Sequence, residues 1–323
     1  MKNISKLYNL LLLLSCPFFA HAQDFAKADS TVKAYPAFSD IDTLAAQINA
    51  DFTTEADKAR AIFTWIALNI QYDLPAAGKG ERQVAYSYRS EEEKLAIQKK
   101  VKLDLAIKTI RSKKGVCQGY ATLFFVLAEK TGLEAAIVPG TSKSHTSQIG
   151  NGPGANDHAW NAVKINGKWK LLDATWASGV VEGIKPAFKF KFNDGYFFAT
   201  PDVFFLNHYP KEDKWLLTGK TPQDFASLPL YYGNYLMGGY EFLSPQTGML
   251  TSKKQDTVSF KIRNLKAGDT VHYAFAHERK VKEVKPVISG DIALFDVPLG
   301  TVANDILTIY INQKSVAAYK INR

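Results

Sequence analysis

The chain has 323 residues, of which 46% are hydrophobic and 22% are charged, values that are typical of a globular protein with a sizeable core. This length is sufficient for two domains of ordinary size. The formal net charge of +9 comes from lysines and arginines that are spread along the chain, without basic runs interleaved with aromatic residues. We therefore interpret the charge as a solvated basic surface and expect no nucleic-acid partner.

Residues 1–22 are predicted to be a signal peptide. Two lysines, Lys2 and Lys6, precede an apolar stretch at 10–19, and Ala20-His21-Ala22 provides a small-x-small cleavage site. The apolar stretch is too short to span a bilayer, and no later segment of the sequence is apolar enough to anchor the chain. We therefore expect a protein that is exported to the periplasm or secreted, with no transmembrane anchor.

The sequence contains two cysteines, and they have different expected fates. Cys16 lies inside the predicted signal peptide, where Leu13-Leu14-Ser15-Cys16 loosely resembles a lipoprotein box with a poorly fitting Leu14. Lipid anchoring at Cys16 is therefore the less favoured alternative to soluble export. Cleavage leaves Cys117 as a single thiol that can form no intrachain disulfide. In an oxidising compartment such a thiol is either buried and inert or reactive.

The segment before Cys117 is predicted to be mainly helical. Residues 39–70 indicate two helices, the second of which begins at the capping box Thr54-Glu55-Ala56-Asp57. Residues 76–100 are polar and are expected to form a surface insertion. A short helix over 103–112 is expected to follow and to end at a glycine, Gly115.

Cys117 is predicted to start a strongly apolar helix that ends at Gly132. A helix N-terminus carries positive partial charge and N–H groups without partners, so it favours a thiolate and can bind a developing oxyanion. The alternative interpretation is that Cys117 is a small core residue packed beneath Phe124 and Phe125.

The dipeptide Asn166-Gly167 predicts a two-residue hairpin turn between strands at 158–165 and 168–176. In that register His158 and Asp173 lie on one face as diagonal neighbours, roughly 7–8 Å apart at the backbone, so their side chains can meet. A slip of one residue would move Asp173 to the other face. The alternatives are a histidine satisfied near a strand edge and an aspartate that caps a helix or turn.

From about residue 240 the helical periodicity disappears. Short alternating segments follow one another and are separated by turn residues, a pattern typical of a small antiparallel immunoglobulin-like sandwich. These segments are 257–262, 270–276, 284–288, 292–297, 306–311 and 315–321. The expected organisation is a catalytic domain over 23–235 followed by a C-terminal β-sandwich over 240–323.

Three sequence blocks resemble the core of the transglutaminase-like superfamily. They are Gly115-Val116-Cys117-Gln118-Gly119-Tyr120-Ala121, His158-Ala159-Trp160-Asn161 and Leu172-Asp173-Ala174-Thr175-Trp176. The resemblance implies an α+β papain-like fold in which a catalytic helix packs on an antiparallel sheet. It also implies that Cys117 is the nucleophile, His158 the base and Asp173 the residue that orients the base.

Further blocks resemble the extension found in the kyphoscoliosis-peptidase-like branch of that superfamily, so that the resemblance covers about residues 40–230. These blocks are Tyr196-Phe197-Phe198, Pro201, His208-Tyr209-Pro210 and Trp215-Leu216-Leu217. The aromatic neighbours of His208 favour a packing or structural role for it. A second oxyanion donor is expected from the segment before Cys117, with Gln71 and Tyr72 as candidates.

The predicted function is acyl transfer or amide hydrolysis through a thioester on Cys117, with a protein or peptide as substrate and hydrolysis favoured. Two alternatives are a protein-crosslinking transglutaminase and a non-catalytic binding or scaffold protein that retains the fold. The sequence contains no H-E-x-x-H, C-x-x-C or calcium-loop pattern, so we expect neither a metal site nor a cofactor.

Overall fold

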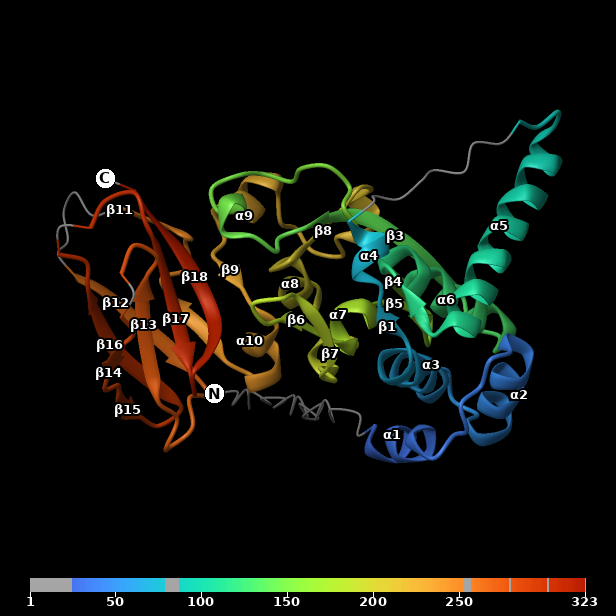
Figure 1. Ribbon diagram of the computed structural model, residues 1–323, viewed down its shortest axis with the longest axis horizontal. Coiled ribbons are helices and arrows are strands. Elements are labelled where there is room, and N and C mark those ends of the chain that lie inside the picture. Colours follow the sequence, from blue (N-terminus) through green and yellow to red (C-terminus); the bar gives the residue numbers. More distant parts are fainter. Residues whose placement is uncertain (1–24, 79–86, 252–256, 279, 301, 323) are drawn as a thin grey trace, which may run out of the picture.

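The structure is a computed structural model that describes residues 25–78, 87–251, 257–278, 280–300 and 302–322. The predicted signal peptide and Cys16 lie outside the described residues. The molecule is elongated, with a helical end, a central sheet and a β-sandwich at the opposite end (Figure 1). The chain therefore has a mixed core followed by a region of antiparallel strands, as the sequence predicts.

The helical end is built from three helices before the nucleophile region: α1 (Ala26–Lys33), α2 (Ile41–Asp51) and α3 (Glu55–Asn69). The predicted N-cap of α3 is confirmed, because the Thr54 side chain accepts the N–H of Asp57 at 3.1 Å. The Asp57 carboxylate accepts the Thr54 hydroxyl at 2.7 Å, in place of the backbone N–H that a capping box uses. Helix α1, which the sequence analysis does not predict, is fixed by Asp29, whose carboxylate accepts from Arg60 of α3 at 2.8 and 2.6 Å.

The polar segment before Cys117 differs from the prediction. A single turn of helix, α4 (Leu74–Ala77), precedes it, and α5 runs from Glu91 to Ser112 over 22 residues. The expected short helix over 103–112 is therefore only the C-terminal half of α5, and part of the expected insertion is helical. Ser90 caps α5 by accepting the N–H of Glu93 at 3.1 Å. The sequence Ser90-Glu91-Glu92-Glu93 is typical of a helix start, but the polar composition of the segment favoured a loop.

The central sheet has the strand order β5-β4-β3-β8 and is antiparallel throughout. Its strands are β3 (Ala135–Ser142), β4 (His158–Ile165), β5 (Lys168–Leu172) and β8 (His208–Pro210). Helix α6 (Cys117–Lys130) packs against β3 and β4. The buried side chain of Asn161 joins these layers, because its Nδ2 donates to Ala121 O at 2.9 Å and to Ala136 O at 3.2 Å.

The predicted hairpin register is confirmed, since Ile165 pairs with Lys168 and Asn161 with Leu172. Asn166 and Gly167 both have positive φ, as a type I′ turn requires. The second strand is shorter than predicted, however. It ends at Leu172, and Asp173 caps the short helix α7 (Ala174–Ser178), so the helix-cap interpretation of Asp173 is also correct.

Short elements lead from the sheet to the sandwich. Strands β6 (Gly179–Glu182) and β7 (Ala187–Phe190) form a hairpin after α7, and a two-stranded parallel pair, β1 (Gln71–Tyr72) and β2 (Lys114–Gly115), precedes α6. The remaining elements are η1 (Thr146–Gln148), η2 (Asp194–Tyr196), α8 (Pro201–Phe205), η3 (Asp213–Trp215), α9 (Pro222–Ser227), β9 (Leu230–Tyr231) and α10 (Gly233–Gly238).

The C-terminal region forms two packed sheets with their own apolar core. One sheet contains β10 (Glu241–Ser244), β12 (Thr257–Arg263), β16 (Ile292–Pro298) and β15 (Val287–Ser289). The other contains β11 (Met249–Thr251), β18 (Lys314–Asn322), β17 (Ile306–Ile311), β13 (Val271–Phe275) and β14 (Lys282–Val284), and β9 pairs with β18 at its edge. Strand β9 therefore belongs to the sandwich although it precedes residue 235.

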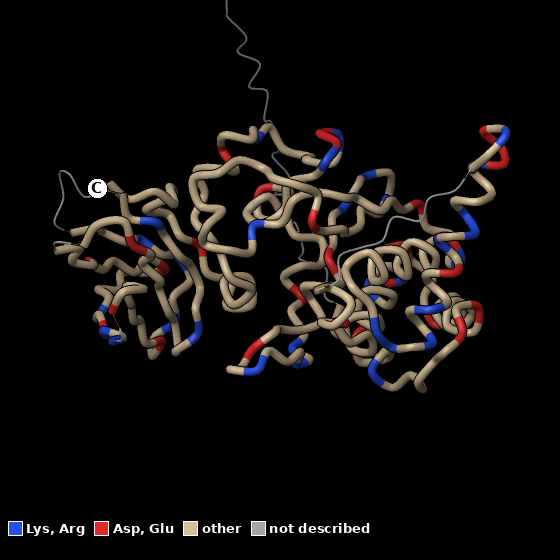
Figure 2. The backbone as a smooth tube through the Cα atoms, turned by 45° about the horizontal axis from the view of Figure 1, so that its top comes forward, with Lys and Arg blue, Asp and Glu red and all other residues tan. Residues whose placement is uncertain are grey.

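Lysine and arginine positions are interspersed with acidic ones over both ends of the molecule (Figure 2). This distribution agrees with the expectation that the basic residues are spread along the chain. Among the described residues, none of the helices combines the length and apolar character needed to cross a membrane.

Replacing Asn161 tests how α6 is held on the sheet. We expect Asn161→Ala to lower the free energy of unfolding by about 1–3 kcal/mol, because a buried carbonyl of α6 and a part-buried carbonyl of β3 lose the amide donor of Asn161. Denaturant unfolding measures this change. Lys170→Ala, at an exposed position of β5, is the control and should change stability by less than about 0.5 kcal/mol. Equal stabilities of the Asn161→Ala variant and the wild type would contradict this account.

Lys143, directly after β3, is fully buried and is not paired with a carboxylate in the described part of the chain. Its Nζ donates to Phe225 O and, at 3.1 Å, to Leu228 O at the end of α9, and it lies 4.7 Å from the centroid of the Phe225 ring. Burial lowers the pKa of Lys143 to about 8.

This pKa makes the stability contribution of Lys143 depend on pH. Between pH 8 and about 10.4, the ordinary lysine pKa, the unfolded chain binds the proton more tightly than the folded one. The free energy of unfolding of the wild type should therefore rise with pH in this window, relative to Lys143→Met, by about 1 kcal/mol per pH unit. Denaturant unfolding at pH 7, 8, 9 and 10 measures the difference, and a constant difference would overturn the assignment.

Candidate active site

Cys117 is the first residue of α6 and is about nine-tenths buried. Its N-cap, Val116, has no side chain that can accept from the first N–H groups of the helix, so these groups stay available to a bound anion. The parallel pair β1–β2 places Gly115 beside Tyr72 just before the helix. The predicted helix start is therefore confirmed. Cys117 is buried, as the alternative interpretation expects, but it does not belong to the apolar cluster that contains Phe124.

Two glycines flank Cys117 because α5 approaches closely. A Cβ atom at Gly119 would lie 2.9 Å from Thr109 Oγ1, and one at Gly115 would lie 3.2 Å from Thr109 Cγ2. Both distances are shorter than comfortable contacts between nonbonded heavy atoms. The glycines of the Gly-Val-Cys-Gln-Gly block thus allow Thr109 of α5 to brace the backbone on both sides of Cys117.

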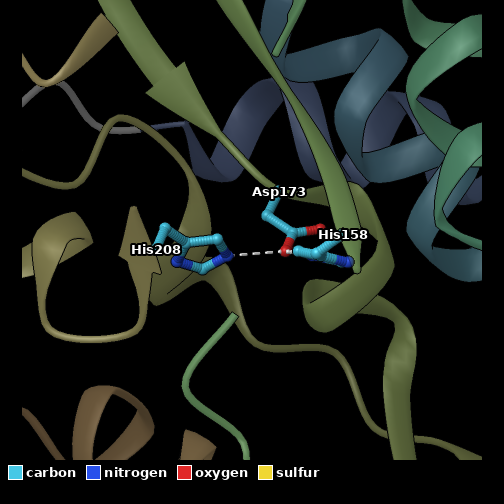
Figure 3. Close-up of side chains that lie close together, drawn as sticks. All are labelled: His158, Asp173 and His208. Carbon is cyan, nitrogen blue, oxygen red and sulfur yellow. Dashed lines mark hydrogen bonds and ion pairs between the residues drawn. The ribbon is translucent and has the colours of Figure 1, made fainter. Parts of the chain in front are cut away.

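His158 and Asp173 meet as the hairpin register predicts. His158 is the first residue of β4, and its Nε2 lies 2.7 Å from Asp173 Oδ2 (Figure 3). Both side chains are buried. The other carboxylate oxygen, Oδ1, accepts the N–H groups of Thr175 and Trp176 at 2.8 and 3.0 Å. Because Nε2 of His158 makes its hydrogen bond with Asp173, Nδ1 is the nitrogen that can exchange a proton with Cys117.

Electrostatics at this pair favour a protonated histidine. Burial by itself would lower the pKa of His158, but the charge of Asp173, the hydrogen bond to Asp173 and a hydrogen bond with Cys117 together raise it above its ordinary value. For Asp173, burial would raise the pKa of the carboxyl, and His158 and His208 outweigh this and hold it well below its usual range. The site therefore stabilises an imidazolium between a carboxylate and a sulfur.

His208, for which the sequence favours a packing or structural role, is a further member of this cluster. It starts β8, is 2% exposed, and its Nε2 lies 3.0 Å from the same Oδ2 of Asp173 (Figure 3). Packing is part of its environment, since its ring stacks on Phe204 with centroids 4.1 Å apart. The block His208-Tyr209-Pro210 is the part of the sequence that could have indicated this contact. Its aromatic neighbours favour packing instead, and they give no sign of the hydrogen bond to Asp173.

The other histidines among the described residues lie outside this cluster. His145 precedes η1, His272 lies on β13, and His277 pairs with Asp305 in the sandwich. Gln71 and Tyr72, the candidate oxyanion donors, lie on β1, which pairs with the strand that leads directly into Cys117. This position is compatible with a donor role for either of them.

One group among the described residues has the spacing of a metal site. His158, Asp173 and His208 each offer one ligand atom, and these atoms lie within 4.8 Å of one another. Imidazole and carboxylate are donors that Zn²⁺ accepts. In the structure, however, the two histidines reach the carboxylate at hydrogen-bond distance, and protons suffice to join the three groups.

Comparison with known proteins identifies this part of the chain. Residues 42–174 match the family model described as the transglutaminase-like superfamily. These residues belong to that superfamily. Kyphoscoliosis peptidase of Homo sapiens is 32% identical over 232 residues, covering 71% of this chain and 32% of the relative, and that of Mus musculus is 30% identical over 244 residues, covering 74% and 34%.

The chain thus spans about a third of the length of the curated relatives that it matches. The comparisons agree with the superfamily and with the kyphoscoliosis-peptidase-like branch that the sequence blocks indicate. A solved structure described as a TGase matches with a TM-score of 0.29 and 21% identity, covering 57% of this chain and 40% of the other.

The pairing of His158 with Asp173 can be tested through the reactivity of the thiol. We expect Asp173→Asn to slow alkylation of Cys117 by iodoacetamide at pH 6.5 by about tenfold or more, because the pKa of His158 then falls and the imidazolium that stabilises a thiolate is lost. At pH 9.5, where ordinary thiols ionise, the two proteins should react at similar rates. Mass spectrometry of the alkylated peptide measures the rate.

Asp104→Asn is a matched control for this experiment, because Asp104 is exposed on α5 and forms an ion pair with Lys100 at 2.8 Å. It should react as the wild type does over the whole pH range. Equal rates for the Asp173→Asn variant and the wild type at pH 6.5 would contradict the assigned coupling.

Proposed function

We propose that the protein is an exported cysteine enzyme that hydrolyses amide bonds in proteins or peptides through a thioester on Cys117. The observation that carries this proposal is the order of contacts in the site. The side chain of Cys117 interacts with that of His158 and contributes to its raised pKa, and Nε2 of His158 makes a hydrogen bond with Asp173 at 2.7 Å. A nucleophile, a base and a group that orients the base are the parts that acyl transfer needs.

In the first step the Cys117 thiolate attacks the carbonyl carbon of the substrate amide and forms a C–S bond. The resulting oxyanion would be stabilised by N–H groups at the start of α6, which have no partner within the helix. His158, as imidazolium, gives its proton to the amide nitrogen. The C–N bond then breaks, the amine leaves, and the acyl group stays on Cys117 as a thioester.

In the second step water attacks the thioester carbonyl. His158, now neutral, takes a proton from the water, the C–S bond breaks, and the acid product and the thiolate are released. The role of Asp173 is to keep Nε2 of His158 protonated, so that Nδ1 is the nitrogen that gains and loses the proton. An amine in place of water would give transamidation by the same steps.

Water as the acceptor is supported by the curated relatives, which are named peptidases. A purely binding protein would have no need for a thiol, an imidazole and a carboxylate in one buried cluster. The buried charges cost solvation energy, and catalysis is a reason to retain them. Export after cleavage of residues 1–22 remains part of the proposal and agrees with a single unpaired thiol in the mature chain.

Hydrolysis can be tested with casein and with dansylcadaverine as a competing amine. We expect new peptide termini from casein and little incorporation of the dansyl amine. Cys117→Ala should lower the rate of cleavage by about four orders of magnitude, since it removes the nucleophile. Incorporation of the amine at a rate that exceeds cleavage would assign the protein as a transglutaminase.

The thioester itself can be trapped without a known substrate. A cell extract is incubated with the wild type or with Cys117→Ala, quenched in acid, and the peptide that contains residue 117 is analysed by mass spectrometry. We expect an acyl adduct on the wild type alone. Absence of both cleavage and adduct, together with an ordinary alkylation profile, would support a scaffold role.

A further inference from the structure

We infer that His208 is a positioning residue for the proposed reaction: it holds Asp173 in the orientation that His158 needs, and it is itself held by a chain of hydrogen bonds that begins in the C-terminal sandwich. This inference rests on the proposed function of Cys117, His158 and Asp173. It assigns a role to a histidine that does not contact the sulfur, and it gives the sandwich a part in ordering the site.

The carboxylate of Asp173 makes four contacts, and His208 supplies one of them. Oδ1 accepts two backbone N–H groups of α7, and Oδ2 accepts His158 at 2.7 Å and His208 at 3.0 Å. An ionised carboxylate has about four acceptor sites, so this set is complete. Without His208, one site of a fully buried oxygen would lose its donor.

The protonation state of His208 suits a supporting role. Burial lowers the pKa of His208, although Asp173 acts in the opposite direction, and the charge of His158 lowers it further. A neutral imidazole ring carries a single N–H. In His208 we place it on Nε2, which lies 3.0 Å from the charged carboxylate of Asp173, because a hydrogen bond to a charged acceptor is stronger than one from Nδ1 to Phe204 O at 3.2 Å. His208 thus adds a donor without a second cation that would compete with His158.

The surroundings of His208 keep its ring in place. Phe204 stacks on one face, Trp160 meets the ring edge-on with centroids 5.0 Å apart, and Trp176 lies at 4.7 Å. The titratable groups around the ring are Asp173 from the start of α7, His158 from β4 and Tyr196 from η2, whose pKa is raised by burial. Tyr196 therefore stays neutral, and Asp173 and His158 are the charged groups next to the ring of His208.

The backbone of His208 is tied to the sandwich through its neighbour Asn207. The Nδ2 of Asn207 donates to Lys143 O and to Tyr231 O, both at 2.9 Å, and the N–H of Lys143 donates to Asn207 O at 2.8 Å. Tyr231 lies on β9 and pairs with Ala317 of β18. A continuous set of hydrogen bonds therefore runs from β18 through β9 and Asn207 to the strand that carries His208.

The test uses the pH profile of Cys117 alkylation by iodoacetamide, which needs no substrate. We expect His208→Phe, which keeps the ring stack and removes the donor, to slow alkylation at pH 6.5 by about tenfold, the effect of one pKa unit. His208→Gln, whose amide nitrogen can reach the position of Nε2, should restore the rate to within about threefold of the wild type, less than half a pKa unit.

A further variant protects the test against a folding defect. His208→Asn is polar but too short to reach Asp173, so it should react as slowly as His208→Phe while matching His208→Gln in thermal stability. Equal profiles for the Asn and Gln variants would overturn the inference. If the wild type itself reacts only as an ordinary thiol near pH 8.5, the proposed function fails instead.

The link to the sandwich has its own matched pair of variants. Asn207→Ala cuts the bonds to Lys143 O and Tyr231 O, whereas Asn234→Ala cuts a different link to the sandwich, the bond of its Nδ2 to Ser315 O at 3.1 Å. We expect the first to slow alkylation at pH 6.5 by about threefold and the second to leave it unchanged. Similar profiles for the two variants would contradict a specific connection through Asn207.

Discussion

The structure of the site depends on the need to satisfy one buried carboxylate. Asp173 has no exposed surface, and an isolated carboxylate in such a place would be strongly destabilised. Its four contacts come from two elements of the sheet, β4 and β8, and from the helix that it caps. Satisfying this group therefore holds the start of β4, the start of β8 and the first turn of α7 together around one carboxylate.

The sequence predicted the parts of this arrangement that arise from local chemistry. The Asn166-Gly167 turn determines the register, and the register alone brings His158 and Asp173 to one face. The start of α6 at Cys117 follows from the apolar periodicity. The length of β5 was overestimated, because alternation continues past Leu172 although Asp173 accepts N–H groups of the next turn and so begins a helix.

Contacts that join distant segments could not be predicted from periodicity. Asn161 docks α6 on the sheet, but nothing in its position along β4 specifies Ala121 as a partner 40 residues away. His208 lies 35 residues from Asp173, in a segment whose aromatic residues indicated packing. The family resemblance is what places Cys117 beside His158 and Asp173 of the hairpin. It implies no polar role for His208.

Helix α5 has a consequence for the dynamics of the chain near Cys117. Its buried residues, Ala106, Thr109 and Ile110, all lie in its C-terminal half, and its N-terminal turns extend away from the body of the molecule (Figure 1). Amide hydrogens should therefore exchange with solvent quickly near Glu91 and slowly near Thr109, within one continuous helix. Fraying of the distant end can proceed while Thr109 keeps its place against Gly115 and Gly119, so the nucleophile is insulated from motion in its own supporting helix.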